Sequence, residues 1–441
     1  MDLTNDANGA ISWTSTKLPT AFEVLSRTLE FADEGQLTSW HILGAMCAKM
    51  MLAADYSVHR QYEYLSFIYQ YVLPLLGKPY TGFHGRQNEF YDQSINYQDS
   101  QTTVRMYLEL PSRLAGTRWD PGDKLRVHSF LNRLQVAQHR RGIDTVLFSF
   151  FAERLLLSQP QESHIRASEI AGKLAVRSQC PVAFEFRDGN IGVKSVLDPR
   201  LRVLATGVSL HQLIFDALHS LPTLAGGEGF MPAVRSIEDY VASRISHTPN
   251  ATISAFFLAL DMLQISRARI KCYFADTLVD WPTLESLWTL GGKVGTEDNT
   301  RGLYLLKEIW DILRIPEGLR RDSSHPLTLE IPETMKGFIV SYEIKAGRPE
   351  PSPKVYISLR GIDESTKCAR ITVIFRYLGW IRYADNYQDN LRSFPSVDFE
   401  QVTTIQDCIS FSYSGKSGPY MTVYFRQLDP TPTSAIREVD R

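Results

Sequence analysis

The stretch Arg267-Ala268-Arg269-Ile270-Lys271-Cys272-Tyr273-Phe274 is rich in β-branched and aromatic residues for its length, which is typical of a β-strand. Because side chains on a strand alternate between two faces, Arg269, Lys271 and Tyr273 share one face, and the opposite face is apolar. The apolar face is expected to pack on a hydrophobic core. Two interpretations of the polar face stay open: it is the solvated side of a half-buried strand, or it lines a cavity that holds an anion.

The composition sets broad limits on the class of protein. The chain has 441 residues, is 44% hydrophobic and has a formal net charge of −2, enough for one large domain or two to three ordinary ones. A nearly balanced charge does not favour nucleic acid or an anionic membrane as a partner. The acidic start is not typical of a signal peptide, and no apolar run reaches the roughly 20 residues of a membrane span. Five scattered cysteines without C-x-x-C spacing are typical of reduced thiols, so we expect a cytoplasmic protein.

Helix-like and strand-like patterns alternate along the chain. Apolar spacing predicts helices over residues 21–31, 40–54, 60–75, 125–140, 144–157, 165–177, 209–220, 237–246, 303–313 and 364–379. Alternation predicts strands over residues 103–110, 182–186, 191–197, 267–274, 337–346, 353–359, 407–413 and 420–425. Residues 35–39 are expected to break the helical region, and residues 77–100 are expected to form a loop.

Hairpins among these strands predict the fold class. Asp188-Gly189-Asn190 is a strong turn signal between two predicted strands, and hairpins imply antiparallel pairing. The pattern favours an α+β protein with one antiparallel sheet and helices packed on one side. Closure of so long a sheet into a barrel would remove its edges. We expect a disordered start at residues 1–15, a single domain over 16–427 and a loose tail at 428–441.

Basic residues and tyrosines recur on the same faces of separate predicted strands. The basic residues are Arg105, Lys194, Arg269, Lys271 and Lys354, and the tyrosines include Tyr273, Tyr356 and Tyr424. If the sheet closes, these faces meet inside, where several cations without a counterion would be very unfavourable. A polyphosphate would neutralise the cations, and the tyrosine rings would then face a carbocation. The alternative, that these are all solvated strand faces, stays open.

Several other chemistries lack their sequence signatures. The chain contains no G-x-x-x-x-G-K-[ST], G-x-G-x-x-G, H-E-x-x-H or G-x-S-x-G motif. It also lacks an Asp-Asp-x-x-Asp run that would hold a magnesium diphosphate; the nearest run, Asp385-Asn386-Tyr387-Gln388-Asp389, is expected to be a solvated turn. A diphosphate held by arginine and lysine does not require a metal ion, so no metal site is expected.

Short segments spread over nearly the whole chain stand in an order that resembles a known family. They are Trp40 with residues 56–62 and 74–77, Val104-Arg105, residues 183–186 with Val193-Lys194, residues 268–273, residues 290–293 and residues 353–357. Together they resemble the fungal aromatic prenyltransferases of the dimethylallyltryptophan synthase type.

This resemblance implies a closed barrel of ten antiparallel strands ringed by helices and built from repeated ααββ units. It also implies transfer of a prenyl group from a diphosphate co-substrate to an electron-rich aromatic small molecule, with no metal or other cofactor. Positions that match the family's diphosphate contacts are Arg105, Lys194, Arg269, Lys271 and Lys354. Positions that match its tyrosine shield around the allylic cation are Tyr273, Tyr356 and Tyr424. No nucleic-acid or membrane partner is expected, and a homodimer is left open.

Three departures from the family pattern stand out. Asp92, in the run Asp92-Gln93-Ser94-Ile95-Asn96, takes the place of the family's glutamate base. It is expected either to serve as that base or to be a loop residue beside a structural Ser/Asn pair. Val196 replaces the shield tyrosine expected after Lys194, and residues 407–410 lack a further usual tyrosine. Loss of two rings is expected either to widen the pocket or to weaken protection of the cation, which could admit a longer prenyl chain or a bulkier acceptor.

The expected function is transfer of a dimethylallyl group to a carbon of a tryptophan-derived indole in fungal secondary metabolism. Asp92, as the base, and Lys194, which would stabilise the departing diphosphate, are the expected catalytic residues. One alternative is a phenolic or polyketide acceptor, with geranyl diphosphate as another donor. A further alternative is a barrel repurposed for non-transfer chemistry such as cyclisation.

Overall fold

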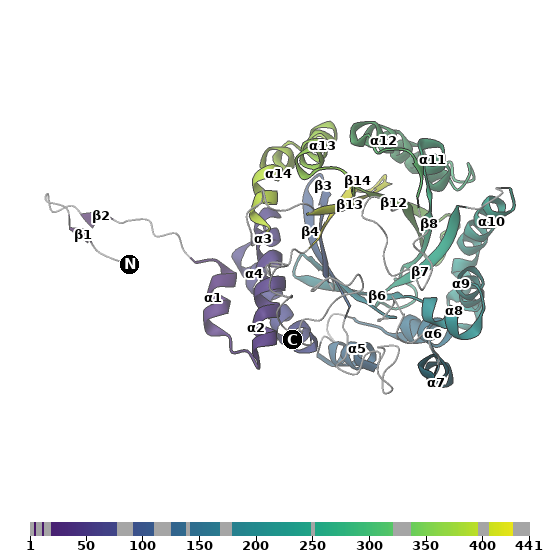
Figure 1. Cartoon of the computed structure of the whole chain (residues 1–441), viewed down its shortest axis with the longest axis horizontal. Helices are drawn as coiled ribbons and strands as arrows, with labels where there is room; N and C mark the ends of the chain where they lie inside the picture. Colours follow the sequence, from purple (N-terminus) through teal and green to yellow (C-terminus); the bar gives the residue numbers. More distant parts are fainter. Residues whose placement is uncertain are drawn as a thin grey trace, which may run out of the picture.

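A strand barrel enclosed by a ring of helices makes up most of this protein (Figure 1). The computed structural model describes residues 4–5, 11–12, 19–76, 91–109, 125–137, 142–167, 179–247, 252–320, 337–395 and 405–426. Of the expected disordered start, the described part is the pair of short strands β1 (Thr4–Asn5) and β2 (Ile11–Ser12). The expected tail at 428–441 lies outside the described residues.

Ten antiparallel strands form the closed barrel. They are β3 (Tyr91–Gln98), β4 (Gln101–Leu108), β5 (Val182–Arg187), β6 (Asn190–Leu197), β7 (Ile253–Asp261), β8 (Ile270–Asp276), β11 (Phe338–Ile344), β12 (Ser352–Ser358), β13 (Gln406–Ser414) and β14 (Gly418–Arg426). Neighbours around the barrel follow chain order, and β14 pairs with β3 to close it. The expected closed ten-stranded antiparallel barrel is therefore confirmed.

Helices surround the barrel on its outer side (Figure 1). The α-helices are α1 (Ala21–Thr28), α2 (Glu34–Ser39), α3 (Ala45–Ala53), α4 (Val58–Phe67), α5 (Leu125–Ala137), α6 (Val146–Leu155), α7 (Gln159–Ala167), α8 (Arg200–Thr206), α9 (Leu210–His219), α10 (Met231–His247), α11 (Trp281–Thr289), α12 (Glu297–Leu313), α13 (Glu364–Tyr377) and α14 (Ile381–Ser393). Two further short strands, β9 (Leu278–Val279) and β10 (Gly318–Leu319), pair outside the barrel. Among the described residues no single helix is long and apolar enough to cross a membrane, although the bent pair Arg200–Thr206 and Leu210–Thr223 passes that test jointly.

The hydrophobic core lies between the barrel wall and the helices. On β8, Ile270, Cys272 and Phe274 are fully buried in this core, and Phe274 contacts Phe215 of α9 at a ring-centroid distance of 6.3 Å. Lys271 alternates with these residues and therefore points into the barrel lumen, as Tyr273 does. Of the two interpretations left open for this stretch, the structure supports a polar face that lines a cavity.

Several local predictions are wrong. Residues 91–98 of the expected loop form β3, whose outward face is buried at Ile95 and Tyr97; residues 77–90 lie outside the described residues. Residues 35–39 do not interrupt the helical region. The side chain of Asp33 accepts a hydrogen bond from the backbone N–H of Gln36 and so caps the start of α2. α2 then continues through the π-helical turn Trp40–Gly44 into α3. The acidic run at 385–389 lies inside α14 rather than in a turn.

Some elements carried too weak a sequence signal to be predicted. These are β3, β7, α8, α11 and α14. The helix expected at 165–177 is displaced, since α7 ends at Ala167 and residues 168–178 lie outside the described residues. The remaining predicted strands and helices correspond to observed elements, but α10 and α12 each begin six residues before the predicted start, and the helix expected to reach residue 75 is α-helical only to Phe67.

Candidate active site

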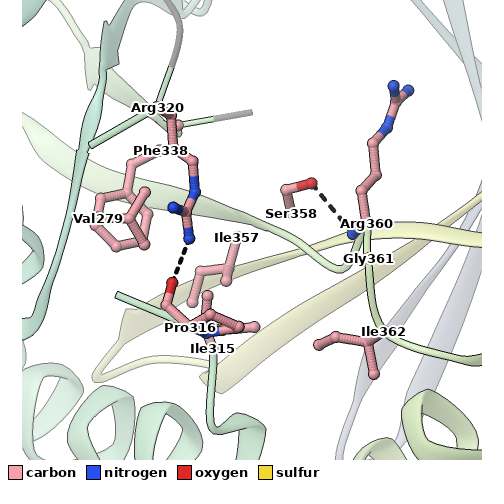
Figure 2. A pocket seen from close by; sticks show the side chains of 11 residues that line it. Val279, Ile315, Pro316, Arg320, Phe338, Ile357, Ser358, Arg360, Gly361 and Ile362 are labelled. Atoms are coloured by element: carbon pink, nitrogen blue, oxygen red, sulfur yellow. Dashed lines mark hydrogen bonds between the residues drawn. The ribbon is translucent and has the colours of Figure 1, made fainter. Parts of the chain in front are cut away.

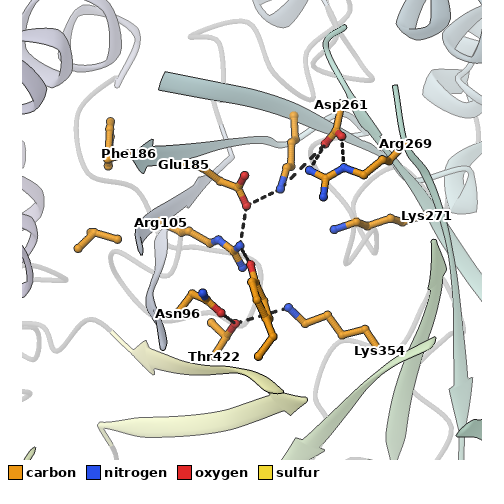
Figure 3. A network of polar contacts seen from close by, with 12 residues as sticks. Asn96, Arg105, Glu185, Phe186, Asp261, Arg269, Lys271, Lys354 and Thr422 are labelled. Carbon is orange, nitrogen blue, oxygen red and sulfur yellow. Dashed lines mark hydrogen bonds and ion pairs between the residues drawn. The ribbon is translucent and has the colours of Figure 1, made fainter. Parts of the chain in front are cut away.

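A cavity of about 720 Å³ lies at the end of the barrel that holds the β3–β4 and β13–β14 turns. Its walls are inward-facing side chains of the barrel strands. All five basic residues expected at a diphosphate site line this cavity: Arg105, Lys194, Arg269, Lys271 and Lys354. Figure 3 shows how side chains from separate strands converge there. The prediction that the strand faces carrying these residues meet inside a closed barrel is therefore confirmed.

Arg105 and Lys194 share one carboxylate. Arg105 Nη2 lies 2.8 Å from Glu185 Oε1, and Lys194 Nζ contacts the same oxygen. Glu185 lies on β5 between β4 and β6 and pairs directly with Arg105. Burial would raise the pKa of Glu185, but the three nearby cations Arg105, Lys194 and Lys271 lower it well below its ordinary value. Glu185 is therefore ionised and holds both basic side chains in place.

Arg269 and Lys271 have carboxylate partners on the neighbouring strands. Arg269 binds Asp261 through Nε and Nη2, and its Nη1 lies 3.4 Å from Glu343 Oε2. Lys271 Nζ lies 3.7 Å from the same Glu343 oxygen. Although burial opposes it, the surrounding cations lower the pKa of Glu343 to about 2. Arg269 lies one residue before β8, rather than inside the strand as the sequence suggested.

The lumen therefore contains counterions, which the sequence analysis did not assign. Glu185, Asp261 and Glu343 accompany the five basic residues, so five cations less three carboxylates leave an excess of two positive charges when all are ionised. The carboxylates hold the basic side chains in position but do not neutralise all of their positive charge. An excess of positive charge in a partly buried cavity attracts an anion strongly, because solvent screens it poorly.

Lys354 differs from the other cations. Among the described residues it forms no ion pair; its Nζ lies 3.5 Å from Thr422 Oγ1, and that hydroxyl donates to Asn96 Oδ1 at 3.2 Å (Figure 3). Burial, with the nearby cations, lowers the pKa of Lys354 well below its ordinary value. Burial likewise lowers the pKa of Lys194 to about 7. These two lysines are thus the cations that gain most from a bound anion.

Several buried polar atoms in this region lack partners among the described residues, and two of them are nitrogen donors. These two are Arg105 Nε and the side-chain nitrogen of Asn96, both buried. Buried donors are normally hydrogen-bonded, so unpaired ones inside a cavity call for an explanation. Arg105 already places Nη2 on Glu185 and on the hydroxyl of Tyr420, which leaves Nε as a free donor.

The tyrosines expected to shield the cation form a connected arc in the lumen, and Tyr273 and Tyr356 each lie two residues after a lysine on the same strand. The rings of Tyr273 and Tyr356 have centroids 5.8 Å apart, and their hydroxyl oxygens are 3.1 Å apart. Tyr356 and Tyr424 follow with centroids 5.9 Å apart. Burial raises the pKa values of Tyr356 and Tyr424, so these phenols are neutral at ordinary pH. The arc offers neutral aromatic faces next to the cationic layer.

Asp92 lies on the lumen face of β3, near the end of the strand opposite the β3–β4 turn, and it does not line the cationic cavity. Its backbone pairs with Tyr107 on β4 and with Arg426 on β14, and its side chain is exposed. The expectation that Asp92 is a loop residue is therefore wrong, because β3 extends through it. The candidate base is therefore on the lumen face of a strand that carries none of the five basic residues, and it is separate from the cavity that those residues line.

Small side chains occupy the positions where the family pattern led us to expect rings. Val196 faces the lumen and pairs with Ala259 of β7. On the other wall, Cys408 and Ser410 pair with Tyr424 and Thr422. Val196 therefore lies beyond the Tyr273 end of the arc, whereas Cys408 and Ser410 lie on β13, between the strands that carry Tyr356 and Tyr424.

A smaller cavity of about 270 Å³ lies near β12 and the β9–β10 pair (Figure 2). Most of the side chains that line it are apolar, including Val279, Phe338 and Ile357. Arg360 extends away from them and binds Asp407 at 2.6 Å. This cavity does not bring together the chemical groups found in the barrel lumen.

Comparison with known proteins places this arrangement in a family. The profile of the family described as tryptophan dimethylallyltransferase matches residues 36–390. The chain belongs to the tryptophan dimethylallyltransferase family. The family resemblance stated from sequence is confirmed, and the chain is an aromatic prenyltransferase.

Individual members of the family align over almost their full length. The roquefortine prenyltransferase of Penicillium rubens is 32% identical over 91% of this chain and 93% of its own. The crystal structure of AnaPT from Neosartorya fischeri has a TM-score of 0.81 at 28% identity and covers 93% of this chain and 98% of that one. The structure of NotF in complex with brevianamide F and DMSPP has a TM-score of 0.78 at 27% identity, with 93% and 99% covered.

Proposed function

We propose that this prenyltransferase moves a dimethylallyl group from its diphosphate to an aromatic carbon of a tryptophan-derived indole, with the diphosphate held by protein cations and no metal ion. The observation that carries the proposal is the convergence of five basic side chains directly beside an arc of three tyrosines. The family name and the NotF complex with brevianamide F support an indole acceptor and a dimethylallyl donor.

The cationic layer would drive breakage of the carbon–oxygen bond. The bonding electron pair leaves with the diphosphate, whose growing negative charge is stabilised by Arg105, Lys194, Arg269, Lys271 and Lys354. Arginine can bind two phosphate oxygens at once, whereas lysine acts as a point charge. The free Nε of Arg105 is one donor ready for this purpose.

The tyrosine arc would protect the allylic cation that remains. The faces of Tyr273, Tyr356 and Tyr424 offer cation–π stabilisation and keep water away from the electrophile. The indole ring then attacks the cation and forms the new carbon–carbon bond. Asp92, on the lumen face of β3, takes up the ring proton and restores aromaticity.

A product assay with metal removed tests the proposal. The protein is incubated with dimethylallyl or geranyl diphosphate in EDTA, against tryptophan, tryptophan-containing cyclic dipeptides and phenols, and the products are identified by mass spectrometry. We expect prenylated indole from dimethylallyl diphosphate without added metal. A strict magnesium requirement would exclude diphosphate binding by cations alone, and prenylation of phenols only would replace the indole acceptor.

A pair of lysine variants tests the role of the cavity. Lys271→Ala removes a lumen cation beside Glu343, and we expect kcat/KM for the diphosphate to fall by about 10²- to 10³-fold. Lys293→Ala is the matched control, because Lys293 is 46% exposed and pairs only with surface Asp239 in the described part of the chain. Unchanged turnover in Lys271→Ala would refute the assignment of the cavity to the diphosphate.

A further inference from the structure

A β-bulge on β7 lies opposite Tyr273 of the arc. Ala255 pairs with Phe274 and Leu258 pairs with Cys272, so Phe256 and Phe257 together oppose the single residue Tyr273. Bulges of this kind redirect side chains and often occur beside active sites. The extra residue brings a phenylalanine against a lumen tyrosine while Leu258 keeps its place in the outer core.

The two phenylalanines extend the arc of tyrosine rings. Phe257 and Tyr273 have ring centroids only 4.3 Å apart at an interplanar angle of 30°, which is closer than any pair within the tyrosine arc. Phe256 follows at 4.6 Å from Phe257. The row of rings therefore continues from β14 through β12 and β8 to β7.

The surroundings of Phe257 indicate a role in the lumen rather than in the core. Phe256 and Phe257 are both half-buried, and neither belongs to the hydrophobic core between barrel and helices. The next lumen position along β7 is Ala259, which pairs with Val196 on β6. Small side chains thus leave space beside Phe257 at the place where the family pattern led us to expect a β6 tyrosine.

We propose that Phe257 is a shielding residue for the allylic cation and takes the place of the ring missing at Val196. This inference rests on the proposed prenyl transfer. After the carbon–oxygen bond breaks and its electron pair leaves with the diphosphate, the cation can react with the aromatic acceptor or with water. Capture by water forms a five-carbon alcohol and releases a proton. Phe257 closes the side of the pocket next to Tyr273, so that the acceptor is the nucleophile that reaches the cation.

The test measures how the cation is partitioned. Wild-type protein, Phe257→Leu and Phe257→Tyr are given dimethylallyl diphosphate and an indole acceptor, and the share of consumed donor recovered as dimethylallyl alcohol or its tertiary isomer is compared with the prenylated product. In Phe257→Leu we expect this alcohol share to rise about three- to tenfold, while KM for the diphosphate stays near the wild-type value. Phe257→Tyr, which keeps a ring, should retain a low alcohol share.

Two further variants separate the ring from the bulge. Phe256→Leu changes the same bulge but leaves the ring of Phe257 in contact with Tyr273, so its alcohol share should stay near wild type. Val196→Tyr combined with Phe257→Leu should lower the alcohol share again, because it restores a ring from β6. Phe257→Met serves if the leucine variant does not fold, since its unbranched side chain adapts to the space left by the ring.

The outcomes distinguish this inference from the proposed function. An alcohol share that is unchanged in Phe257→Leu, raised equally in Phe256→Leu, or raised several-fold in Phe257→Tyr would overturn the shielding role. A raised KM for the acceptor with no change in alcohol share would overturn it too and would assign Phe257 to acceptor binding. If wild-type protein makes no prenylated product with any acceptor, the proposed function itself fails.

Discussion

Lys194 makes diphosphate binding sensitive to pH near neutrality. Burial lowers its pKa to about 7, only partly offset by the carboxylate of Glu185. The charged lysine binds the anion, so affinity should be full below about pH 7 and should fall as pH rises through that value. By linkage, binding at about pH 8 should take up a proton, because the bound diphosphate raises the pKa again.

Calorimetry with an unreactive thiolodiphosphate analogue measures this effect. Titrations over about pH 6 to 9, in two buffers of different ionisation enthalpy, give both affinity and proton uptake. Lys194→Met should bind more weakly below pH 7 and should lose part of the pH dependence, leaving the titration of Lys354 and of the ligand itself. An identical pH slope in wild type and Lys194→Met would contradict the prediction.

Asp92 stays a predicted base, and its position on β3 suggests a clear comparison. Asp92→Asn keeps the size of the side chain but cannot accept the ring proton, so kcat should fall by about 10²-fold while KM for the diphosphate is unchanged. Asp92→Glu restores the family's residue and should retain most of the activity. Full activity in Asp92→Asn would show that proton removal does not depend on this carboxylate.

The cationic residues were predictable from sequence, but their counterions were only partly so. Arg105 and Lys194 lie in strands whose alternation is clear, and the Asp188-Gly189 turn fixes the β5–β6 register. That register puts Glu185 on the lumen face, so this carboxylate was within reach of sequence reasoning. Asp261 was out of reach, because β7 itself was not recognised.

At the scale of elements, strands β3 and β7 were not predicted from the sequence, for opposite reasons. β3, YDQSINYQ, is polar at every lumen position and so was predicted to be a loop. β7, ISAFFLALD, is apolar almost throughout, and its bulge breaks the alternation that would mark a strand. A closed barrel permits both patterns, since its lumen can be filled with polar groups or rings according to function.

The packing of α12 on the barrel gives a prediction whose sign is unusual. A glycine inside a helix normally makes the folded protein less stable than an alanine would, by about 1 kcal/mol. At Gly302, however, an added Cβ would lie 2.4 Å from a ring carbon of Trp288 and 2.8 Å from Cβ of Tyr413 on β13. Gly302→Ala should therefore lower the free energy of unfolding by about 1–3 kcal/mol, as overpacking does.

Urea unfolding of two variants tests this close approach. Gly295→Ala is the control, because an added Cβ there meets no atom within 4 Å and the residue lies just before α12. Its free energy of unfolding should change little. A stabilised Gly302→Ala would show that α12 can move away from the barrel wall without cost.

At the scale of the whole molecule, closure unites strands that are distant in sequence. β14 pairs with β3, so strands from the two ends of the barrel segment share one wall. Closure also brings basic residues of β4, β6, β8 and β12 around one cavity. Hairpin signals predicted neighbouring strands, whereas the number of strands and the meeting of the last with the first came from the family resemblance, because loop lengths alone do not set them.

Because basic residues surround one cavity, we expect a bound anion to compensate for the loss of a carboxylate there. Glu185→Gln leaves Arg105 and Lys194 without their shared carboxylate, so the protein should unfold at a lower temperature than wild type. The same change removes a negative charge that competes with the ligand. Inorganic diphosphate should therefore raise the unfolding temperature of Glu185→Gln more than that of wild type, as binding to the folded state requires.

The experiment is thermal unfolding with and without inorganic diphosphate at about pH 6, below the pKa that Lys194 has in wild type. Glu185 raises this pKa, so its loss lowers the pKa of Lys194 further, and the bound diphosphate raises it again. Glu153→Gln is the matched control, because its side chain is 81% exposed outside the barrel and its loss should leave both temperatures unchanged. The expected order of the diphosphate-induced shifts is Glu185→Gln above wild type, with Glu153→Gln equal to wild type. If the shift in Glu185→Gln is no larger, the carboxylate is a required part of the anion site, because it then positions the two cations more than it opposes the ligand.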